Sequence, residues 1–259
     1  MRVFIITQDE PVYTPVYLAK IIQKSSHSIV GITALSPSGH IGWVNLAKQR
    51  LDVYGPVDFM KAVSLYGFSR LMSYWPIRKS GNRFYSVARL AAYYSIPLYP
   101  CSNINAKEYI CRLRELDIDI VLSVAANQRF KRELLDVPRL ACLNVHSALL
   151  PKYRGLDGIF WALVHGETQV GVTVHLMNED FDDGAIVGQQ PFEVSPNDTL
   201  HSLYFKAIEV GSTLLSQVLD QFDSGTVLTK TNDIAEGSYF SWPNGEAARR
   251  FRAQGRRFF

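Results

Sequence analysis

Three side-chain types that suit acid–base chemistry gather in one stretch of the chain, residues 143–188. Asn144 and His146 stand two residues apart at the end of an apolar run. Strand side chains alternate between faces, so an amide and an imidazole at this spacing point the same way. A second apolar run breaks at an acidic segment that contains Asp182 and Asp183. We therefore expect an amide, an imidazole and a carboxylate at or just beyond strand ends, where open α/β sheets bind ligands.

These groups suit proton transfer and oxyanion stabilisation better than covalent catalysis. Ser147 adjoins His146, but neighbouring strand residues face opposite ways, and no Ser or Cys occupies a nucleophile elbow. The stretch also lacks the residue spacing of a metal site. An amide N–H and a protonated imidazole would stabilise a developing oxyanion, while a carboxylate holds the imidazole charge or relays a proton. Such a site suits acyl transfer from a carrier to an amine, with both reactants held together.

Each of these residues also has an ordinary structural explanation. A histidine at a strand end is more often packed and hydrogen-bonded than catalytic. Adjacent aspartates often belong to a surface loop or cap a helix. The hypothesis of a reactive site therefore depends on the three side chains meeting in one pocket.

The elements that must position these residues alternate between strand-like and helix-like patterns. Such alternation predicts an α/β domain with a mainly parallel sheet. The segment 125–130 should leave its strand at the same edge as Asn144 and border the same pocket. We expect strands over residues 2–7, 29–35, 96–99, 118–124, 141–145, 170–177 and 185–194, and helices over residues 15–24, 86–94, 106–115, 159–164 and 199–222.

The composition is that of an ordinary globular protein. Of 259 residues, 47% are hydrophobic and 20% charged, and the net charge of +3 is too small to argue for a nucleic-acid partner. Three cysteines argue against a disulfide framework. No apolar run reaches the roughly 18 residues of a membrane span, and the first residues resemble a strand more than a signal peptide. We expect one main, cytoplasmic domain. Residues 8–14 contain no glycine, so a dinucleotide fingerprint or P-loop is absent there.

Two segments allow more than one interpretation. Residues 36–95 predict a helical, aromatic insertion packed on the sheet, although its aromatic residues could instead line a substrate pocket or a dimer interface. The tail ends in RRFRAQGRRFF, whose five arginines could bind phosphate or an acidic ligand. We favour a solvated arm packed through Phe251 and Phe258. The expected division is a catalytic domain over 1–222 and a short C-terminal extension over 223–259.

The segments LNVHSALLPKYRG and GVTVHLMNEDFDDG closely resemble the signature of formyltransferases that use 10-formyltetrahydrofolate. That family includes methionyl-tRNA, glycinamide ribonucleotide and sugar N-formyltransferases and the formyltetrahydrofolate hydrolases. Its pattern is Asn-x-His, a Leu-Leu-Pro loop ending in Gly, Gly-x-Thr-x-His and Asp-x-Gly. In this chain the pattern falls at Asn144 and His146, 149–151 with Gly155, 171–175, and Asp182 with Gly184. The resemblance covers residues 118–222 well and implies a Rossmann-like fold with helices on both faces.

The resemblance also implies residue roles. Asn144 and His146 would polarise the formyl group and stabilise its tetrahedral intermediate. Asp182, two residues before Gly184, would assist proton transfer and keep His146 charged, and His175 would support the site. The pterin ring of the folate would lie against two loops, largely through backbone groups: Ala126, Asn127, Gln128 and Arg129 in the first, and Asn178, Glu179, Asp180 and Phe181 in the second. No metal is implied.

Departures from the family pattern narrow the expected substrate. The chain after residue 222 is too short for the barrel domain with which the methionyl-tRNA enzymes hold tRNA. The first loop lacks the Gly-Ser-Asn segment of the glycinamide ribonucleotide enzymes, and no regulatory domain precedes the first strand as in the hydrolases. The ending, Tyr239-Phe-Ser-Trp-Pro and then Arg250-Phe-Arg, is similar to the tails of sugar N-formyltransferases.

We therefore expect an N-formyltransferase whose donor is 10-formyltetrahydrofolate and whose acceptor is a primary amine. The first choice of acceptor is an amino sugar carried on a nucleotide, and another small amine is the second. Two alternatives stay open, namely a formyltetrahydrofolate hydrolase and a non-catalytic folate-binding or scaffold module. We expect no nucleic-acid or membrane partner, and a homodimer is an open alternative.

Overall fold

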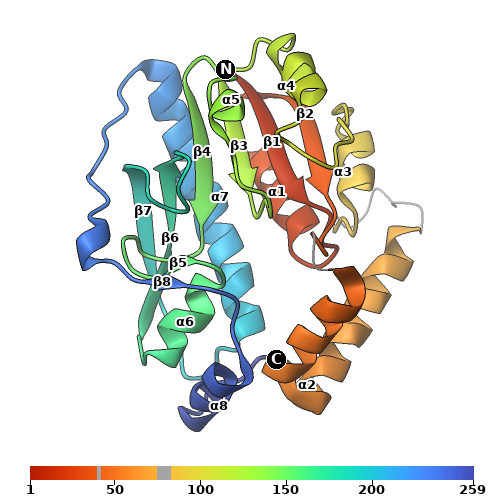
Figure 1. Ribbon diagram of the computed structural model, residues 1–259, viewed down its shortest axis with the longest axis vertical. Coiled ribbons are helices and arrows are strands. Elements are labelled where there is room, and N and C mark those ends of the chain that lie inside the picture. The colour runs from red at the N-terminus through yellow and green to blue at the C-terminus, as the bar shows by residue number, and fades with distance from the viewer. Residues whose placement is uncertain (40–41, 75–82) are drawn as a thin grey trace.

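A six-stranded mixed sheet forms the centre of the molecule, with strand order β2-β1-β3-β4-β6-β7 (Figure 1). The computed structural model describes residues 1–39, 42–74 and 83–259. Strands β1 to β4 run parallel, whereas β6 and β7 are antiparallel to their neighbours. The predicted Rossmann-like α/β fold with a mainly parallel sheet is confirmed. The strands are β1 Arg2–Gln8, β2 Ser28–Leu35, β3 Ile120–Val124, β4 Ala141–His146, β6 Gln169–Leu176 and β7 Ile186–Glu193.

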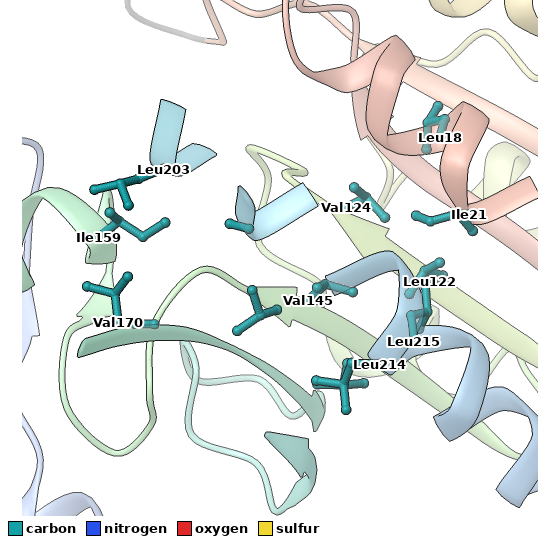
Figure 2. Close-up of a cluster of buried hydrophobic side chains, with 14 of the residues drawn as sticks. Leu18, Ile21, Leu122, Val124, Val145, Ile159, Val170, Leu203, Leu214 and Leu215 are labelled. Atoms are coloured by element: carbon teal, nitrogen blue, oxygen red, sulfur yellow. The ribbon is translucent and has the colours of Figure 1, made fainter. Parts of the chain in front are cut away.

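The central strands are apolar throughout because helices cover both faces of the sheet. Alternate residues of β1 enter two separate cores: Val3 and Ile5 pack in one, and Phe4 and Ile6 pack in the other. The first and larger core brings together side chains from α1, β3, α6 and α7 (Figure 2). The second includes side chains of α4 and α5. The helices are α1 Thr14–Lys24, α3 Val87–Tyr93, α4 Lys107–Arg114, α5 Arg132–Leu135, α6 Gly158–Val164, α7 Leu200–Ser224 and α8 Gly245–Ala253.

Helix α7 begins and ends at recognisable signals. The Thr199 hydroxyl accepts a hydrogen bond from Ser202 N (3.1 Å), and the Ser202 hydroxyl accepts one from Thr199 N (3.0 Å). This reciprocal capping box satisfies two backbone donors that the first helical turn leaves unpaired. Gly225 ends the helix in the left-handed conformation. Thr199 is therefore the N-cap of this helix.

The insertion is helical, and its two helices differ: α3 packs in the larger core as expected, whereas α2 contributes few buried residues. Helix α2, Gly42–Ser73, has 32 residues with a break at Gly55 (φ 64°) before Pro56. Its main helical neighbour is α8, and Val53 and Ser69 are its buried residues (Figure 1). Apolar side chains are spread around the helix instead of forming one stripe, so most of them cannot be buried against a single surface. Residues 75–82, including Trp75 of the expected aromatic group, lie outside the described residues.

The strand expected over residues 96–99 is also wrong. Leu98 forms one isolated bridge with Ile32, supported by hydrogen bonds from Ile32 N to Pro97 O (3.0 Å) and from Tyr99 N to Ile32 O (2.9 Å). Pro97 and Pro100 have no N–H to donate. The ladder therefore cannot extend toward residue 95, because that step needs a hydrogen bond from the N–H of residue 97.

The C-terminal residues pack onto the rest of the molecule. Phe251 and Phe258 are buried in the larger core, and the Arg252 side chain donates to the carbonyl oxygens of Val53 (3.2 Å) and Tyr54. The expectation of an arm anchored by its two phenylalanines is therefore confirmed. Strand β8, Tyr239–Phe240, pairs in parallel with β5, Arg154–Gly155. The division at residue 222 stays a prediction. None of the described helices is both long and apolar enough to cross a membrane.

Candidate active site

The carboxyl ends of β3 and β4 lie at the same edge of the sheet. Their parallel register pairs Val124 with Val145, so the loop after β3 and the end of β4 leave together. Asn144 and His146 lie among the last three residues of β4, as expected. Strand β6 runs the other way, and its register places His175 directly opposite Asn144. His175, the penultimate residue of β6, therefore reaches the site from the strand beside β4.

Asp182 meets both β4 side chains. The Asn144 amide Nδ2 donates to Asp182 Oδ1 at 3.2 Å, and His146 Nδ1 lies 3.5 Å from Asp182 Oδ2. His146 is buried, with 7% of its surface exposed. The neighbouring Asp183 turns away and faces Arg154 Nη1 at 3.6 Å. The structure thus brings Asn144, His146 and Asp182 together and separates Asp182 from Asp183.

Both ring nitrogens of His146 face oxygen atoms. Nε2 lies 2.8 Å from the carbonyl oxygen of Tyr153, and Nδ1 faces Asp182. A protonated ring would donate from both nitrogens. Burial alone would raise the pKa of the Asp182 carboxyl, but the nearby His146 and the hydrogen bond from the N–H of Gly155 lower that pKa well below its usual range. The surroundings of Asp182 therefore favour its carboxylate form.

His175 holds the Asn144 amide in place through hydrogen bonds on both sides of its ring. Its Nδ1 lies 2.8 Å from the carbonyl oxygen of Leu176, which can only accept, so Nδ1 carries the proton. Nε2 is then free to accept from Asn144 Nδ2 at 3.1 Å. One amide hydrogen of Asn144 is fixed by His175, and the other points to Asp182. This arrangement fixes which end of the amide carries the donors.

The loop after β6 folds back to deliver Asp182. Asp182 itself adopts a left-handed conformation (φ 51°). A Cβ placed on Gly184 would lie 1.9 Å from the carbonyl oxygen of Leu176, so only glycine fits this return. Asn232 Nδ2 donates to the carbonyl oxygens of Asp182 (2.9 Å) and Gly184 (3.2 Å). Asn232 is 8% exposed and was not among the residues predicted from the sequence.

Strand β8 holds the other catalytic loop. Arg154 N donates to Ser238 O, and Leu156 N donates to Phe240 O, both at 2.9 Å. A Cβ placed on Gly155 would lie 2.2 Å from Phe240 O, and its φ is 91°. This close approach frees the Gly155 N–H to donate to Asp182 Oδ2 at 2.8 Å. The C-terminal segment therefore braces the loop that contacts both His146 and Asp182.

The threonine of the Gly-x-Thr-x-His segment fixes the start of that loop. Thr173 Oγ1 donates to Ala148 O (2.6 Å) and accepts from Leu150 N (3.2 Å). On the same strand, a Cβ on Gly171 would lie 2.4 Å from the Leu149 side chain. Thr173 and Gly171 of the second sequence segment therefore contact residues 148–150 of the first. These contacts explain why the two segments occur together.

The two loops predicted to hold a ring system also lie side by side. The Arg129 side chain donates to Glu179 O and to Asp180 Oδ1 (3.1 Å), and its guanidinium lies 5.8 Å from the centre of the Phe181 ring. Within the first loop, Asn127 donates to Ser36 O and Gln128 donates to Ser102 O, each at 2.7 Å. Phe181 is 52% exposed and immediately precedes Asp182. An aromatic surface is thus available beside the three polar groups, with Ala126 and Asn178 on the adjoining backbone.

Metal ligation has no support in the part of the chain that the structure describes. No group of three or more His, Cys, Asp or Glu side chains there could hold an ion.

The protein is a Rossmann-like α/β domain in which Asn144, His146 and Asp182 meet at the carboxyl edge of the sheet. A family model described as formyl transferase matches residues 81–219, more than half of the 259 residues. The chain belongs to the formyl transferase family.

One similar protein is the methionyl-tRNA formyltransferase of Blochmanniella pennsylvanica, which is 33% identical over 166 residues. The match covers 64% of this chain and 52% of the relative, so this chain spans about half the length of that curated relative.

Two solved structures share the fold. Phosphoribosylglycinamide formyltransferase from Bacillus halodurans is 19% identical with a TM-score of 0.59, and the alignment covers 86% of this chain and 96% of that chain. An N-formyltransferase from Helicobacter canadensis, solved in complex with folinic acid and dTDP-3-aminofucose, is 18% identical with a TM-score of 0.59, covering 92% and 70%.

Proposed function

We propose that this protein is an N-formyltransferase that moves a formyl group from 10-formyltetrahydrofolate to a primary amine. The proposal depends on one observation: Asn144, His146 and Asp182 meet at the carboxyl edge of the sheet in a formyl transferase domain. These residues hold amide donors, an imidazole and a carboxylate around one small volume. Such groups suit a reaction in which a carbonyl oxygen gains negative charge.

The donor would lie between the loops 126–129 and 178–181. The residues fit a flat, polar ring system, because the exposed Phe181 ring offers a stacking surface and Arg129 ties the two loops together. Backbone groups of both loops would supply the hydrogen bonds to the pterin edge. This placement brings the formyl group toward Asp182, the residue that directly follows the second loop.

The reaction needs three tasks from the protein's side chains. The acceptor nitrogen attacks the formyl carbon, and the electron pair of the C=O bond moves to oxygen. Asn144 would then donate to this oxygen the amide hydrogen that now points to Asp182, and His146 would stabilise the same charge. The bond from carbon to N10 breaks as the C=O bond forms again, and N10 takes up a proton. Asp182 keeps His146 protonated and relays that proton.

For the acceptor we favour an amino sugar carried on a nucleotide. The guanidinium of Arg50 lies 3.9 Å from the centre of the Trp242 ring system, and the buried indole N–H of Trp242 has no hydrogen-bond partner among the described residues. An arginine stacked on an indole suits an anionic group next to an aromatic base. Another small amine is the second choice. Transfer to tRNA, the activity named for the curated relative, is a further outcome that the experiment can return.

The experiment is a panel of acceptors with 10-formyltetrahydrofolate, in which tetrahydrofolate release is followed by absorbance. The panel contains nucleotide-linked amino sugars, glycinamide ribonucleotide, small amines and methionyl-tRNA. Release that depends on one amine class and is lost in His146→Ala supports the proposal and identifies the acceptor. Release at the same rate without any amine supports a hydrolase. No release, together with tight binding of folinic acid, supports a non-catalytic folate-binding module.

A further inference from the structure

A second polar cluster lies at the carboxyl edge of the sheet, after β1 instead of β4. The Glu10 carboxylate accepts hydrogen bonds from the backbone N–H groups of Val12 (2.8 Å), Tyr13 (2.7 Å) and Thr14 (3.3 Å). These bonds fold the segment between β1 and α1 into a fixed turn. Tyr13 is thereby directed toward α7, where its hydroxyl lies 2.6 Å from His201 Nδ1.

Asp157 belongs to the same cluster, where it lies near Tyr13. It is the last residue before α6 and adopts a left-handed conformation (φ 64°). A residue at this position ordinarily caps the helix, but the Asp157 side chain makes no capping hydrogen bond. It accepts instead from the hydroxyl of Tyr204 on α7. A left-handed backbone is unfavourable for a residue with a side chain, so this placement is maintained against strain.

The chain itself places Asp157 near the catalytic residues. Gly155, whose N–H contacts Asp182, is two residues earlier, and consecutive Cα atoms are about 3.8 Å apart. The Cα of Asp157 is therefore within about 8 Å of the Cα of Gly155. One short loop thus contacts Asp182 through its backbone and carries Asp157 toward the segment after β1.

The cation that acts on Asp157 is Arg50. The groups near it are Tyr204 on α7, Tyr13 on the segment after β1, and Arg50 and Tyr54 on α2. Glu10 lies one step further away, near Tyr13, Tyr54 and Arg50. Arg50 donates to Tyr54 (3.2 Å) and stacks on Trp242, and across residues 1–39, 42–74 and 83–259 Asp157 makes no ion pair. Burial raises the pKa of the Asp157 carboxyl, against the effects of the Tyr204 hydrogen bond and the Arg50 charge. Because burial disfavours an unpaired negative charge here, a cationic ligand would stabilise the Asp157 carboxylate.

We propose that Asp157 binds the amino group of the acceptor in its ammonium form and takes the proton that this group must lose before attack. The inference rests on the proposed formyl transfer and assigns its acceptor side. The substrate class that it requires is an amine that is protonated at neutral pH. The aromatic rings of Tyr13 and Tyr204, 5.3 Å apart edge to face, would surround the cation.

The proton and electron balance is complete without another reactant. The ammonium N–H bond breaks, its electron pair stays on nitrogen and the proton moves to the Asp157 carboxylate. The neutral nitrogen then attacks the formyl carbon, as described above, and a second N–H proton passes through His146 to N10. The net products are the formamide, tetrahydrofolate and one proton, which Asp157 releases to water.

The test is Asp157→Asn, because asparagine has the same shape and tolerates the left-handed conformation. The matched control is Asp119→Asn. Asp119 is a buried aspartate that accepts from Arg2 N (2.7 Å) and Arg139 Nε (2.8 Å), next to the amino-terminal end of β3 and thus at the opposite edge of the sheet. The acceptor is the amine that the unmodified protein formylates fastest in the panel. Its affinity is measured by calorimetry with folinic acid bound, alongside the affinity of the analogue that has a hydroxyl in place of the amine.

We expect Asp157→Asn to weaken binding of the amine at least about tenfold, the loss of one charged hydrogen bond, and to leave the hydroxyl analogue unchanged. Its kcat/KM should increase tenfold per pH unit up to the pKa of the free amine, whereas the unmodified protein should level off at lower pH. Asp119→Asn should change neither quantity. Equal amine affinity and an unchanged pH profile in Asp157→Asn would overturn the assignment of Asp157 alone. If the unmodified protein formylates no amine, the proposed function fails and this inference fails with it.

Discussion

Two loops of the candidate site, the one after β4 and the one after β6, border the same edge of the sheet as helix α2. The loops and the helix are held in opposite ways. Each catalytic loop is fixed by backbone contacts and by a glycine with no room for a side chain, as at Gly155 and Gly184. Helix α2 has two buried residues and exposes large apolar side chains such as Val57 (69% exposed) and Leu71 (65%). This difference indicates that the loops around Asn144, His146 and Asp182 are preformed. Helix α2, in contrast, is attached by polar contacts such as the ion pair of Arg70 with Asp9 (2.8 Å). We infer that acceptor choice resides on the α2 side.

The largest effect should come from Asn144, His146 and Asp182. In the proposed mechanism His146 stabilises the formyl oxygen, so for His146→Ala we expect turnover to fall by roughly 10²–10⁴-fold with little change in thermal stability. Steady-state rates and a thermal melt monitored by circular dichroism measure the two quantities. Near-normal turnover in a folded His146→Ala protein would contradict the preformed site.

Gly155→Ala should damage both the fold and activity. The new Cβ would meet Phe240 O at 2.2 Å and would require a positive φ, so β5 and β8 must separate. We expect a loss of several kcal/mol in unfolding free energy by urea titration, together with reduced kcat. Gly225→Ala is the matched control, since Gly225 also has a positive φ but no atom within 4 Å. It should cost only about 1 kcal/mol. Equal losses would show that β8 does not brace the loop.

Asn232→Ala should have a smaller and more specific effect. It leaves the carbonyl oxygens of Asp182 and Gly184 without their donor, at a cost of about 1–3 kcal/mol. Because Asp182 then moves relative to His146, kcat should fall while the KM for the acceptor stays constant. A decrease in stability with unchanged kcat would limit Asn232 to a structural role.

The pH dependence of stability tests the charge on Asp182. Its folded pKa is below the unfolded value of about 3.9, so its stabilising contribution is fully present above that value. The contribution is lost as pH falls from about 4 toward the folded pKa. Unfolding titrations should therefore show the difference between the unmodified protein and Asp182→Asn shrinking below about pH 4. A difference that does not vary down to pH 2.5 would contradict this assignment.

The smallest effect should come from the exposed face of α2. Leu71→Glu places a charge on a residue that is 65% exposed, so a monomer should lose less than about 0.5 kcal/mol and keep its activity. Sedimentation of both proteins tests the dimer alternative. A dimer that dissociates on this substitution would show that α2 is covered by a second copy.

Most of the catalytic side could be predicted because its residues are local in sequence. Asn144 and His146 are two apart, and the Asp182 segment follows the next strand. Asn232 could not be predicted, since a single asparagine that contacts carbonyl oxygens 50 residues away leaves no pattern. The same holds for β5 and β8, which have two residues each and no periodicity.

The antiparallel pairing of β6 and β7 could have been predicted from the length of the connection between them. Only residues 177–185 separate them, which is short for the crossover that parallel neighbours require. For α2, helical propensity predicted the element correctly, but its apolar residues are distributed on all sides. Its position beside α8 therefore depends on long-range contacts such as Asp52 to the N–H of Gly245 (2.7 Å).

The central claim is that the three β4 and loop residues transfer a formyl group to an amine. The most direct measurement supplies 10-formyltetrahydrofolate with a ¹³C-labelled formyl carbon, together with the amine panel, and detects products by mass spectrometry in a single turnover. The account predicts label in one formamide with the unmodified protein and none with His146→Ala. Label found only in formate, or equally in the formamide from His146→Ala, would contradict it.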